Sequence, residues 1–204
     1  MKSIFNFIIK PKVNRYNNIK KIDNKELILN TEIFSHQYVS RVGVVLETPT
    51  AYKTNIKVGD EVIVHHNVFR RWHNQNDEEK NSRNYFEEDK YFVYIDQIFA
   101  YKANNKWEAL DGYCFVKPIE KIESSIIKNN EKERPLIGVL KYLNNNLKKT
   151  GLKQNDLVGF TPESEYEFVI EKEKLYRILT KDITIKYEYQ GDEKEYNPSW
   201  AKSG

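Results

Sequence analysis

The sequence is poor in several residues and patterns that define common classes of protein. It has one cysteine, Cys114, together with eight glycines and one methionine in 204 residues. A single cysteine cannot form an internal disulfide, so we expect a reducing compartment, the cytoplasm. There is no apolar run of about 18 residues, and no membrane-spanning helix is expected. Residues 1–10 have no small-residue cleavage site, so a secretory signal is not expected either.

Patterns typical of catalysis and of metal binding are also scarce. Cys114 lies in an apolar run, which favours a buried thiol over a nucleophile. His65 and His66 are adjacent, and adjacent residues of a strand face opposite sides, so we expect no metal site. Neither a phosphate-binding glycine loop nor a Ser-His-Asp grouping is present. The sequence therefore predicts a protein that is not an enzyme and needs no cofactor.

The charge is nearly balanced, with 33 basic and 30 acidic residues and a net charge of +3. Fourteen tyrosines, ten phenylalanines and three tryptophans could stack on bases, so a nucleic-acid-binding barrel is one alternative. Acidic residues are interleaved almost everywhere, however, and no basic stripe emerges. Nucleic acid is accordingly the weaker expectation for a partner.

Short apolar runs of four to seven residues, bounded by Asn, Asp, Gly or Pro, indicate an all-β fold of small barrels or sandwiches. Helical periodicity is almost absent. The expected strands are 4–10, 38–46, 61–66, 91–95, 97–101, 113–116, 137–143, 157–160, 166–170, 175–179 and 183–187.

Four segments recur in the same order along the chain, which indicates an internal repeat. Residues 8–11 recur as 115–118, 41–45 as 136–140, 56–63 as 152–159, and 91–101 as 175–185. The sequence thus predicts two tandem small β-barrels. We place the first domain at 1–110, the second at 111–188 and a flexible C-terminal tail at 189–204.

The two copies differ by two insertions in copy one. Pro11 and Gly43 are 32 positions apart, whereas Pro118 and Gly138 are 20 apart. The later interval from residue 60 to 98 is 38 positions, against 27 between 156 and 183. Because loops carry function on a rigid scaffold, we expect the function in copy one.

The ordered landmarks of copy one resemble a known family. An apolar strand, 7–11, precedes a long loop, 14–35, that contains Leu27-Ile28-Leu29. A Gly-Xaa-Val strand, 41–46, returns from the loop, and Val58-Gly59-Asp60 precedes the next strand. This series resembles the GroES-type co-chaperonin family, and the resemblance covers nearly the whole chain as two tandem GroES-like barrels.

The resemblance implies a co-chaperonin that caps a chaperonin ring around an unfolded protein substrate. It implies a mobile loop at 14–35, whose residues Leu27, Ile28 and Leu29 bind the chaperonin. Family members form homo-oligomeric rings, and unpaired strand edges favour association. We therefore expect subunit contacts from the first apolar strand, at Ile4, Phe5, Phe7 and Ile9.

The second insertion, 70–90, lies where the family forms its dome-side hairpin. It begins with the basic and aromatic residues Arg70, Arg71 and Trp72 and continues with acidic clusters. It is either a polar roof or added partner site facing the chamber, or a solvated loop of mixed charge.

Copy two departs from the family because its first loop, 120–134, is short. An alternative function is therefore a structural or assembly protein, for example of a virus, that keeps the GroES fold without chaperonin binding. Tandem co-chaperonins occur in plastids, and diverged ones occur in bacteriophages. A bacteriophage origin would place the protein in the host cytoplasm.

Overall fold

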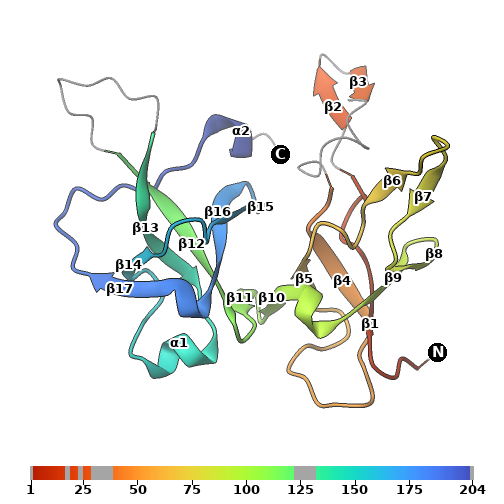
Figure 1. The fold of residues 1–204 in the computed structure, drawn as a ribbon, viewed down its shortest axis with the longest axis horizontal. Helices are drawn as coiled ribbons and strands as arrows, with labels where there is room; N and C mark the ends of the chain where they lie inside the picture. Colours follow the sequence, from red (N-terminus) through yellow and green to blue (C-terminus); the bar gives the residue numbers. More distant parts are fainter. Residues whose placement is uncertain (1, 17–18, 23–24, 29–38, 122–131, 203–204) are drawn as a thin grey trace. The chain divides into compact units, whose positions relative to one another are not determined.

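The chain forms two compact units, residues 1–106 and 107–204, called unit one and unit two (Figure 1). The computed structural model describes residues 2–16, 19–22, 25–28, 39–121 and 132–202, and for 19–22 and 25–28 it describes the backbone alone. Antiparallel β-sheet dominates both units, as the apolar pattern predicts, and the helices α1 and α2 are short.

The described residues of unit one form strands and the 3-10 turn η2, and strand β11 crosses the border to unit two. The elements are β1 (Phe7–Pro11), β2 (Ile19–Ile22), β3 (Lys25–Ile28), β4 (Val42–Glu47), β5 (Glu61–Val64), β6 (Arg71–His73), β7 (Glu79–Asn81), β8 (Tyr85–Glu87), β9 (Lys90–Val93), η2 (Ile95–Gln97), β10 (Ile98–Ala103) and β11 (Lys106–Ala109).

The described residues of unit two form strands, the 3-10 turn η3 and the helices α1 and α2, and β12, β13 and β16 are longer than any strand of unit one. The elements are β12 (Tyr113–Glu120), β13 (Glu133–Tyr142), α1 (Asn145–Lys149), β14 (Leu157–Phe160), β15 (Tyr166–Ile170), β16 (Glu173–Leu179), η3 (Thr180–Asp182), β17 (Ile183–Tyr187) and α2 (Ser199–Lys202).

The two units share one strand order. The main sheet of unit one runs β11-β10-β5-β4-β1-β9-β8, and the sheet of unit two runs β15-β16-β12-β13-β14-β17. Without β11, the order in unit one is β10-β5-β4-β1-β9-β8. It matches the order β17-β14-β13-β12-β16-β15 of unit two strand for strand. Neither order closes on itself among the described strands. The pairs β2–β3 and β6–β7 form separate hairpins in unit one.

The registers match as well as the order. Pro11 lies opposite Gly43 in the β1–β4 pair, and Pro118 lies opposite Gly138 in the β12–β13 pair. A bulge interrupts both pairs at equivalent positions, between residues 8 and 9 and between 115 and 116. The landmarks that recur in the sequence therefore occupy equivalent places in the two sheets.

One recurrence is shifted by a residue from its expected alignment. Ile9 lies opposite Tyr91, and the equivalent Val116 lies opposite Tyr176. Tyr91 therefore matches Tyr176 rather than Leu175. Leu175 and Tyr176 are both hydrophobic, so hydrophobicity alone could not decide which of them corresponds to Tyr91.

The turns before β5 and β14 use the same hydrogen bonds. A carboxylate oxygen of Asp60 accepts the backbone N–H of Lys57 at 2.8 Å, and Asp156 accepts that of Lys153 at 2.8 Å. The residue before each aspartate has a positive φ, 91° in unit one and 70° in unit two. Gly and Asn are the residues that adopt this conformation most readily, which explains why Asn155 can replace the glycine.

Gly43 and Gly138 are required by close strand contacts. A Cβ atom on Gly138 would lie 2.5 Å from the carbonyl oxygen of Lys117 and 2.5 Å from Val116. On Gly43 it would lie 2.9 Å from the carbonyl oxygen of Lys10. Separations below 3.0 Å force the backbone to shift, so both strand pairs depend on the absence of a side chain.

Each unit has its own apolar core. Valine, isoleucine and phenylalanine from the strands, and from the turn after β5, are fully buried in unit one. They include Phe7, Ile8, Ile9, Val62, Ile63, Val64, Phe69, Val93 and Ile98. In unit two the main cluster is Cys114, Val116, Leu140, Leu143, Leu147, Val158, Phe160 and Ile178.

The segment 189–202 differs from the flexible tail that we expected. Residue Ile119 of β12 pairs with Glu195, and Ala201 in α2 has no exposed surface. Strand β16 pairs with residues 113–116 of β12 only. The C-terminal segment lies beside the later residues of β12, which β16 does not reach. Backbone groups there need partners, and the C-terminal segment supplies them.

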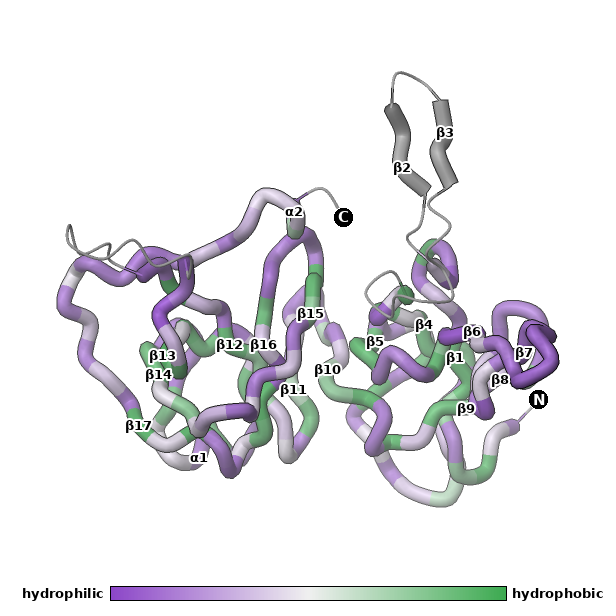
Figure 2. The backbone as a smooth tube through the Cα atoms, turned by 45° about the horizontal axis from the view of Figure 1, so that its top comes forward, coloured by the Kyte–Doolittle hydropathy of each residue, from purple (hydrophilic) through white to green (hydrophobic). Residues whose placement is uncertain are grey.

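Several short strands were not expected from the sequence. Strands β6, β7 and β8 lie in the insertion 70–90, which is therefore built of hairpins rather than an irregular loop. Figure 2 shows the β6–β7 hairpin in the hydrophilic colour, which explains why no apolar run marked it. No helix among the described residues is long and apolar enough to cross a membrane.

Replacing Gly138 with alanine tests the close contact between β12 and β13. We expect Gly138→Ala to destabilise unit two by about 1–3 kcal/mol, because the new methyl group overlaps the Lys117 carbonyl. Cys114 reports on this, since it is fully buried and burial raises the pKa of its thiol to about 12. Its reaction with a disulfide reagent at pH 8 should accelerate about fivefold or more.

The exposed variant Lys181→Ala serves as the control and should leave the labelling rate unchanged. Equal rates for Gly138→Ala and the unsubstituted protein would contradict the steric argument.

Candidate functional site

The longest excursion from either sheet is the segment 12–41 of unit one, between β1 and β4. Its base is paired: the Ser40 N–H donates to the carbonyl oxygen of Arg15 at 3.0 Å, and Tyr16 pairs with Val39. Tyr16 and Val39 are buried. The β2–β3 hairpin lies beyond this base, so the excursion starts from a fixed pair of strands.

The side chain of Arg15 links this base to the second insertion. Its guanidinium donates to the carbonyl oxygens of Phe69 at 2.5 Å and Arg70 at 3.2 Å, and to Oδ1 of Asn81 at 2.7 Å. It also lies 5.5 Å from the ring centre of Tyr91, within the range of a cation–π contact. Burial lowers the pKa of Arg15, but an arginine keeps its charge in proteins.

Tyr16 makes a second link between the two insertions. Its hydroxyl oxygen accepts the backbone N–H of Arg71 at 2.6 Å, and the Arg71 guanidinium lies 5.3 Å from the centre of its ring. Arg71 in turn pairs with Glu79 across the β6–β7 hairpin at 2.7 Å. The two insertions that distinguish copy one thus share one base, which is formed by Arg15, Tyr16 and Arg71.

The expected dome-side residues have different environments. Arg70 is partly buried and offers its carbonyl group to Arg15. Arg71 and Trp72 belong to β6, where they lie opposite Asn81 and Lys80. Trp72 is 48% exposed, and its indole N–H donates to the Asn81 carbonyl oxygen at 3.3 Å. Only Trp72 of the three presents a large apolar surface to solvent.

The expected chaperonin-binding residues fall at the end of the β2–β3 hairpin's second strand. Leu27 and Ile28 lie in β3, opposite Lys20 and Ile19 of β2. Leu29 lies outside the described residues.

The expected subunit-contact residues divide into two groups. Ile4 and Phe5, before β1, are 61% and 67% exposed. Phe7 and Ile9 have no exposed surface, so the expectation that they make subunit contacts is wrong. The reason is topological: β1 is not an edge strand but lies between β4 and β9, and both of its edges are paired.

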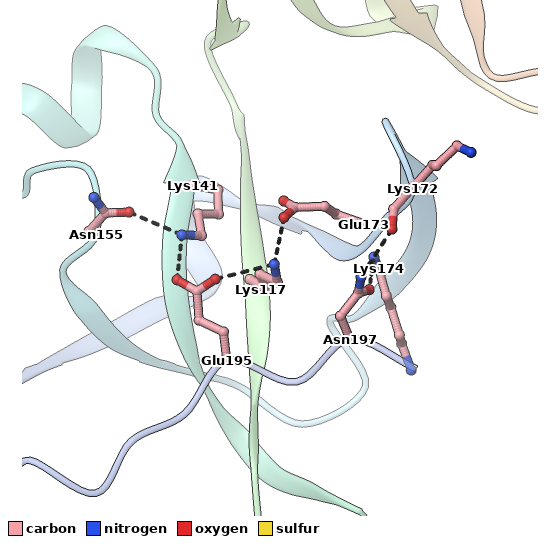
Figure 3. Close-up of polar contacts among 8 residues, drawn as sticks. All are labelled: Lys117, Lys141, Asn155, Lys172, Glu173, Lys174, Glu195 and Asn197. Carbon is pink, nitrogen blue, oxygen red and sulfur yellow. Dashed lines mark hydrogen bonds and ion pairs between the residues drawn. The ribbon is translucent and has the colours of Figure 1, made fainter. Parts of the chain in front are cut away.

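Unit two contains a cluster of paired charges that the sequence did not reveal (Figure 3). Lys117, only 5% exposed, contacts Glu173 at 2.7 Å and Glu195 at 3.2 Å. Lys141 also contacts Glu195 and donates to Asn155 Oδ1 at 3.2 Å. One signal was available, namely a lysine within the apolar run of 113–119.

These contacts alter the acidity of the groups involved. Although burial opposes its charged form, hydrogen bonds to Glu173 and Glu195 raise the pKa of Lys117. Burial also acts against the charge of Glu195, yet hydrogen bonds from Lys141 and Lys117 hold its pKa below the ordinary value. The Glu195 carboxylate and the Lys117 amino group therefore stay charged at neutral pH.

A second buried lysine lies near the first cluster. Lys174 Nζ contacts Glu133 at 2.6 Å and Glu167 at 3.0 Å, and the Tyr176 hydroxyl donates to Glu133 at 2.6 Å. Burial, followed by the hydrogen bond to Glu133, raises the pKa of Tyr176 to about 12. Tyr176 is therefore a neutral hydrogen-bond donor here.

The histidines adopt an arrangement different from the one expected. Strand β5 ends at Val64, so His65 and His66 lie in the following turn, and their rings stack with centres 4.3 Å apart. Across the described part of the chain, no three His, Cys, Asp or Glu side chains come close enough to hold a metal ion.

No protein-family model matches this sequence, and no curated protein matches it.

A single-atom change tests whether Tyr16 joins the two insertions. Tyr16→Phe removes the oxygen that accepts the Arg71 N–H, so we expect a loss of about 1 kcal/mol in the stability of the β6–β7 hairpin. Hydrogen exchange at the Arg71 amide should accelerate about fivefold. Tyr52→Phe, at a partly exposed tyrosine of the same unit, should have no such effect. Unchanged exchange in Tyr16→Phe would contradict the link.

Proposed function

We propose that this protein is a co-chaperonin of the GroES type, which caps a chaperonin ring and assists the folding of the protein enclosed in it. In this proposal the two units are tandem GroES-like small β-barrels, and the excursion of unit one carries the chaperonin-binding residues Leu27, Ile28 and Leu29. The protein would act in the cytoplasm, or in the host cytoplasm if a bacteriophage encodes it.

The observation that supports this proposal most is an asymmetry within a duplicated scaffold. The six shared strands have the same order and register in both units. Between the first two of these strands, unit one has the excursion 12–41, whereas β12 and β13 are paired up to Glu120 and Glu133. A segment that is much longer in one copy than in the other is suited to a binding role, since the shared fold does not need the extra residues.

The energetics favour a segment that binds weakly by itself and strongly in a ring. Burying three aliphatic side chains contributes roughly 1.5–3 kcal/mol each. Ordering a segment costs about 1–2 kcal/mol per residue. The paired base formed by Arg15, Tyr16 and Val39 lowers this cost, because those residues are already ordered. Several such segments on one ring then reinforce each other through effective concentration.

Chaperonin binding can be tested directly. With a GroEL-type ring and ATP, we expect the protein to co-sediment with the chaperonin and to inhibit its ATPase. The double variant Leu27→Asp and Leu29→Asp should abolish both effects, because two carboxylates cannot enter an apolar site without a large desolvation cost. Val13→Asp, which changes a residue of the same excursion that is 78% exposed, is the matched control.

No co-sedimentation by the unsubstituted protein, or equal binding by the double variant, would contradict the proposal. The first outcome would favour a structural or assembly protein with the same fold.

Ring formation provides a separate test of the proposal. Ile4 and Phe5 are exposed apolar residues, and burying Phe5 between subunits would contribute roughly 1.5–3 kcal/mol. We expect native mass measurements to show an oligomer that Phe5→Asp dissociates, with a weakening of at least about tenfold. Phe7→Asp should instead unfold unit one, because Phe7 is fully buried. An oligomer that persists in Phe5→Asp and in Ile4→Asp would contradict a contact at these residues.

A further inference from the structure

The C-terminal segment contacts unit two as a bound peptide contacts a receptor. The carbonyl oxygen of Lys194 accepts the Glu120 N–H at 2.7 Å, and the Tyr196 N–H donates to the Pro118 carbonyl oxygen at 2.8 Å. These bonds add a short antiparallel strand beside β12, past the last residue that pairs with β16. Strand addition of this kind is a general mode of peptide recognition, in which main-chain bonds supply affinity and side chains supply selectivity.

The side chain of Glu195 supplies a charge-specific contact. Figure 3 shows its carboxylate between the amino groups of Lys117 and Lys141. The shared strand order makes the equivalents of these lysines in unit one Lys10, which is exposed, and Leu46. The duplicated scaffold therefore forms without this lysine pair, which indicates that the pair serves the segment rather than the fold.

Asn197 and Trp200 add two further contacts. The Asn197 side chain accepts the Lys174 N–H at 3.0 Å and donates to the carbonyl oxygen of Lys172 at 3.0 Å, so it binds the backbone at the turn between β15 and β16. The ring of Trp200 lies 5.8 Å from Lys174 Nζ. An open groove of about 570 Å³ lies here, lined by residues of the sheet such as Glu133 and by Trp200 itself.

If the C-terminal segment leaves, Lys117 and Lys141 each keep one polar partner in unit two. Lys117 would retain Glu173 at 2.7 Å, and Lys141 would retain Asn155 at 3.2 Å. Removing the only partner of a buried charge is strongly destabilising, but a charge that keeps one partner avoids most of that cost. The link to the rest of the chain, residues 188–192, is exposed throughout.

We propose that these residues of unit two form a peptide-binding site, and that the chain's own C-terminal segment occupies it in cis. The ligand class is a peptide that is extended at a glutamate, has an asparagine two positions later and carries an aromatic residue three positions after that in a short helical turn. A peptide of this chemistry from another polypeptide competes with the C-terminal segment for the site. This site is separate from the excursion of unit one and does not depend on chaperonin binding.

The test uses the full chain and a fluorescent synthetic peptide with the sequence of residues 190–202. Glu195→Lys in the chain places a third positive charge beside Lys117 and Lys141 and should release the segment. Because a tethered segment competes at millimolar effective concentration, we expect this variant to bind the peptide at least about tenfold more tightly than the unsubstituted chain does. A peptide carrying Glu195→Gln should bind at least tenfold more weakly than the unsubstituted peptide.

Glu193→Lys in the chain is the charge-matched control, since the Glu193 carboxylate accepts the N–H groups of Gln190 and Gly191 in its own turn, whereas the lysine pair contacts Glu195. This variant should bind the peptide as weakly as the unsubstituted chain.

Release of the segment is monitored by hydrogen exchange at the Glu120 and Lys174 amides, which donate to the segment, while a protected Cys114 shows that unit two stays folded. If Glu195→Lys exposes Cys114, Asn197→Ala replaces it as the releasing variant. A folded chain with a released segment and no peptide binding would overturn the proposal. So would a segment that stays protected in both variants.

Discussion

The close approach of two strands at a glycine is the constraint on which the rest of both units depends. Gly43 and Gly138 lie opposite Pro11 and Pro118, with no room for a Cβ atom against the facing strand. Because side chains alternate along a strand, this single register determines which residues enter the core in β1, β4 and their counterparts. The turns at Asp60 and Asp156 then bring in the next strand with the same hydrogen bonds. One local requirement, used twice, accounts for the common register of β1 with β4 and of β12 with β13.

The two copies differ away from these glycine contacts, in the insertions of unit one and in the C-terminal segment that unit two binds. In unit one Arg15, at the base of the first insertion, joins the second insertion through three hydrogen bonds, which it donates to Phe69, Arg70 and Asn81. In unit two a lysine pair holds the C-terminal segment through Glu195. Each device consists of charged side chains added at the periphery of an apolar scaffold. Lys117 is buried and Arg15 is partly buried, so each depends on the partners that its own unit supplies.

Much of the fold could be predicted, and the errors have physical causes. Strands 157–160, 166–170 and 183–187 were placed with the correct ends, because each is a short apolar run between turn residues. Strands β6 and β7 were not among the expected strands because their residues are polar, and their pairing relies on local hydrogen bonds rather than burial. Phe7 and Ile9 were assigned to a subunit surface because an apolar strand at the start of a repeat resembles an edge, whereas β1 is central.

The sequence by itself determined the β-rich class, the recurrence of landmarks and the place of the two insertions in copy one, because each of these depends on local composition and spacing. The tertiary structure alone decided that the insertions share a base and that the C-terminal segment is bound. Arg15 and Asn81, like Lys117 and Glu195, are far apart in the chain. With 33 basic and 30 acidic residues, many ion pairs were possible, and only the folded backbone selects which of them meet.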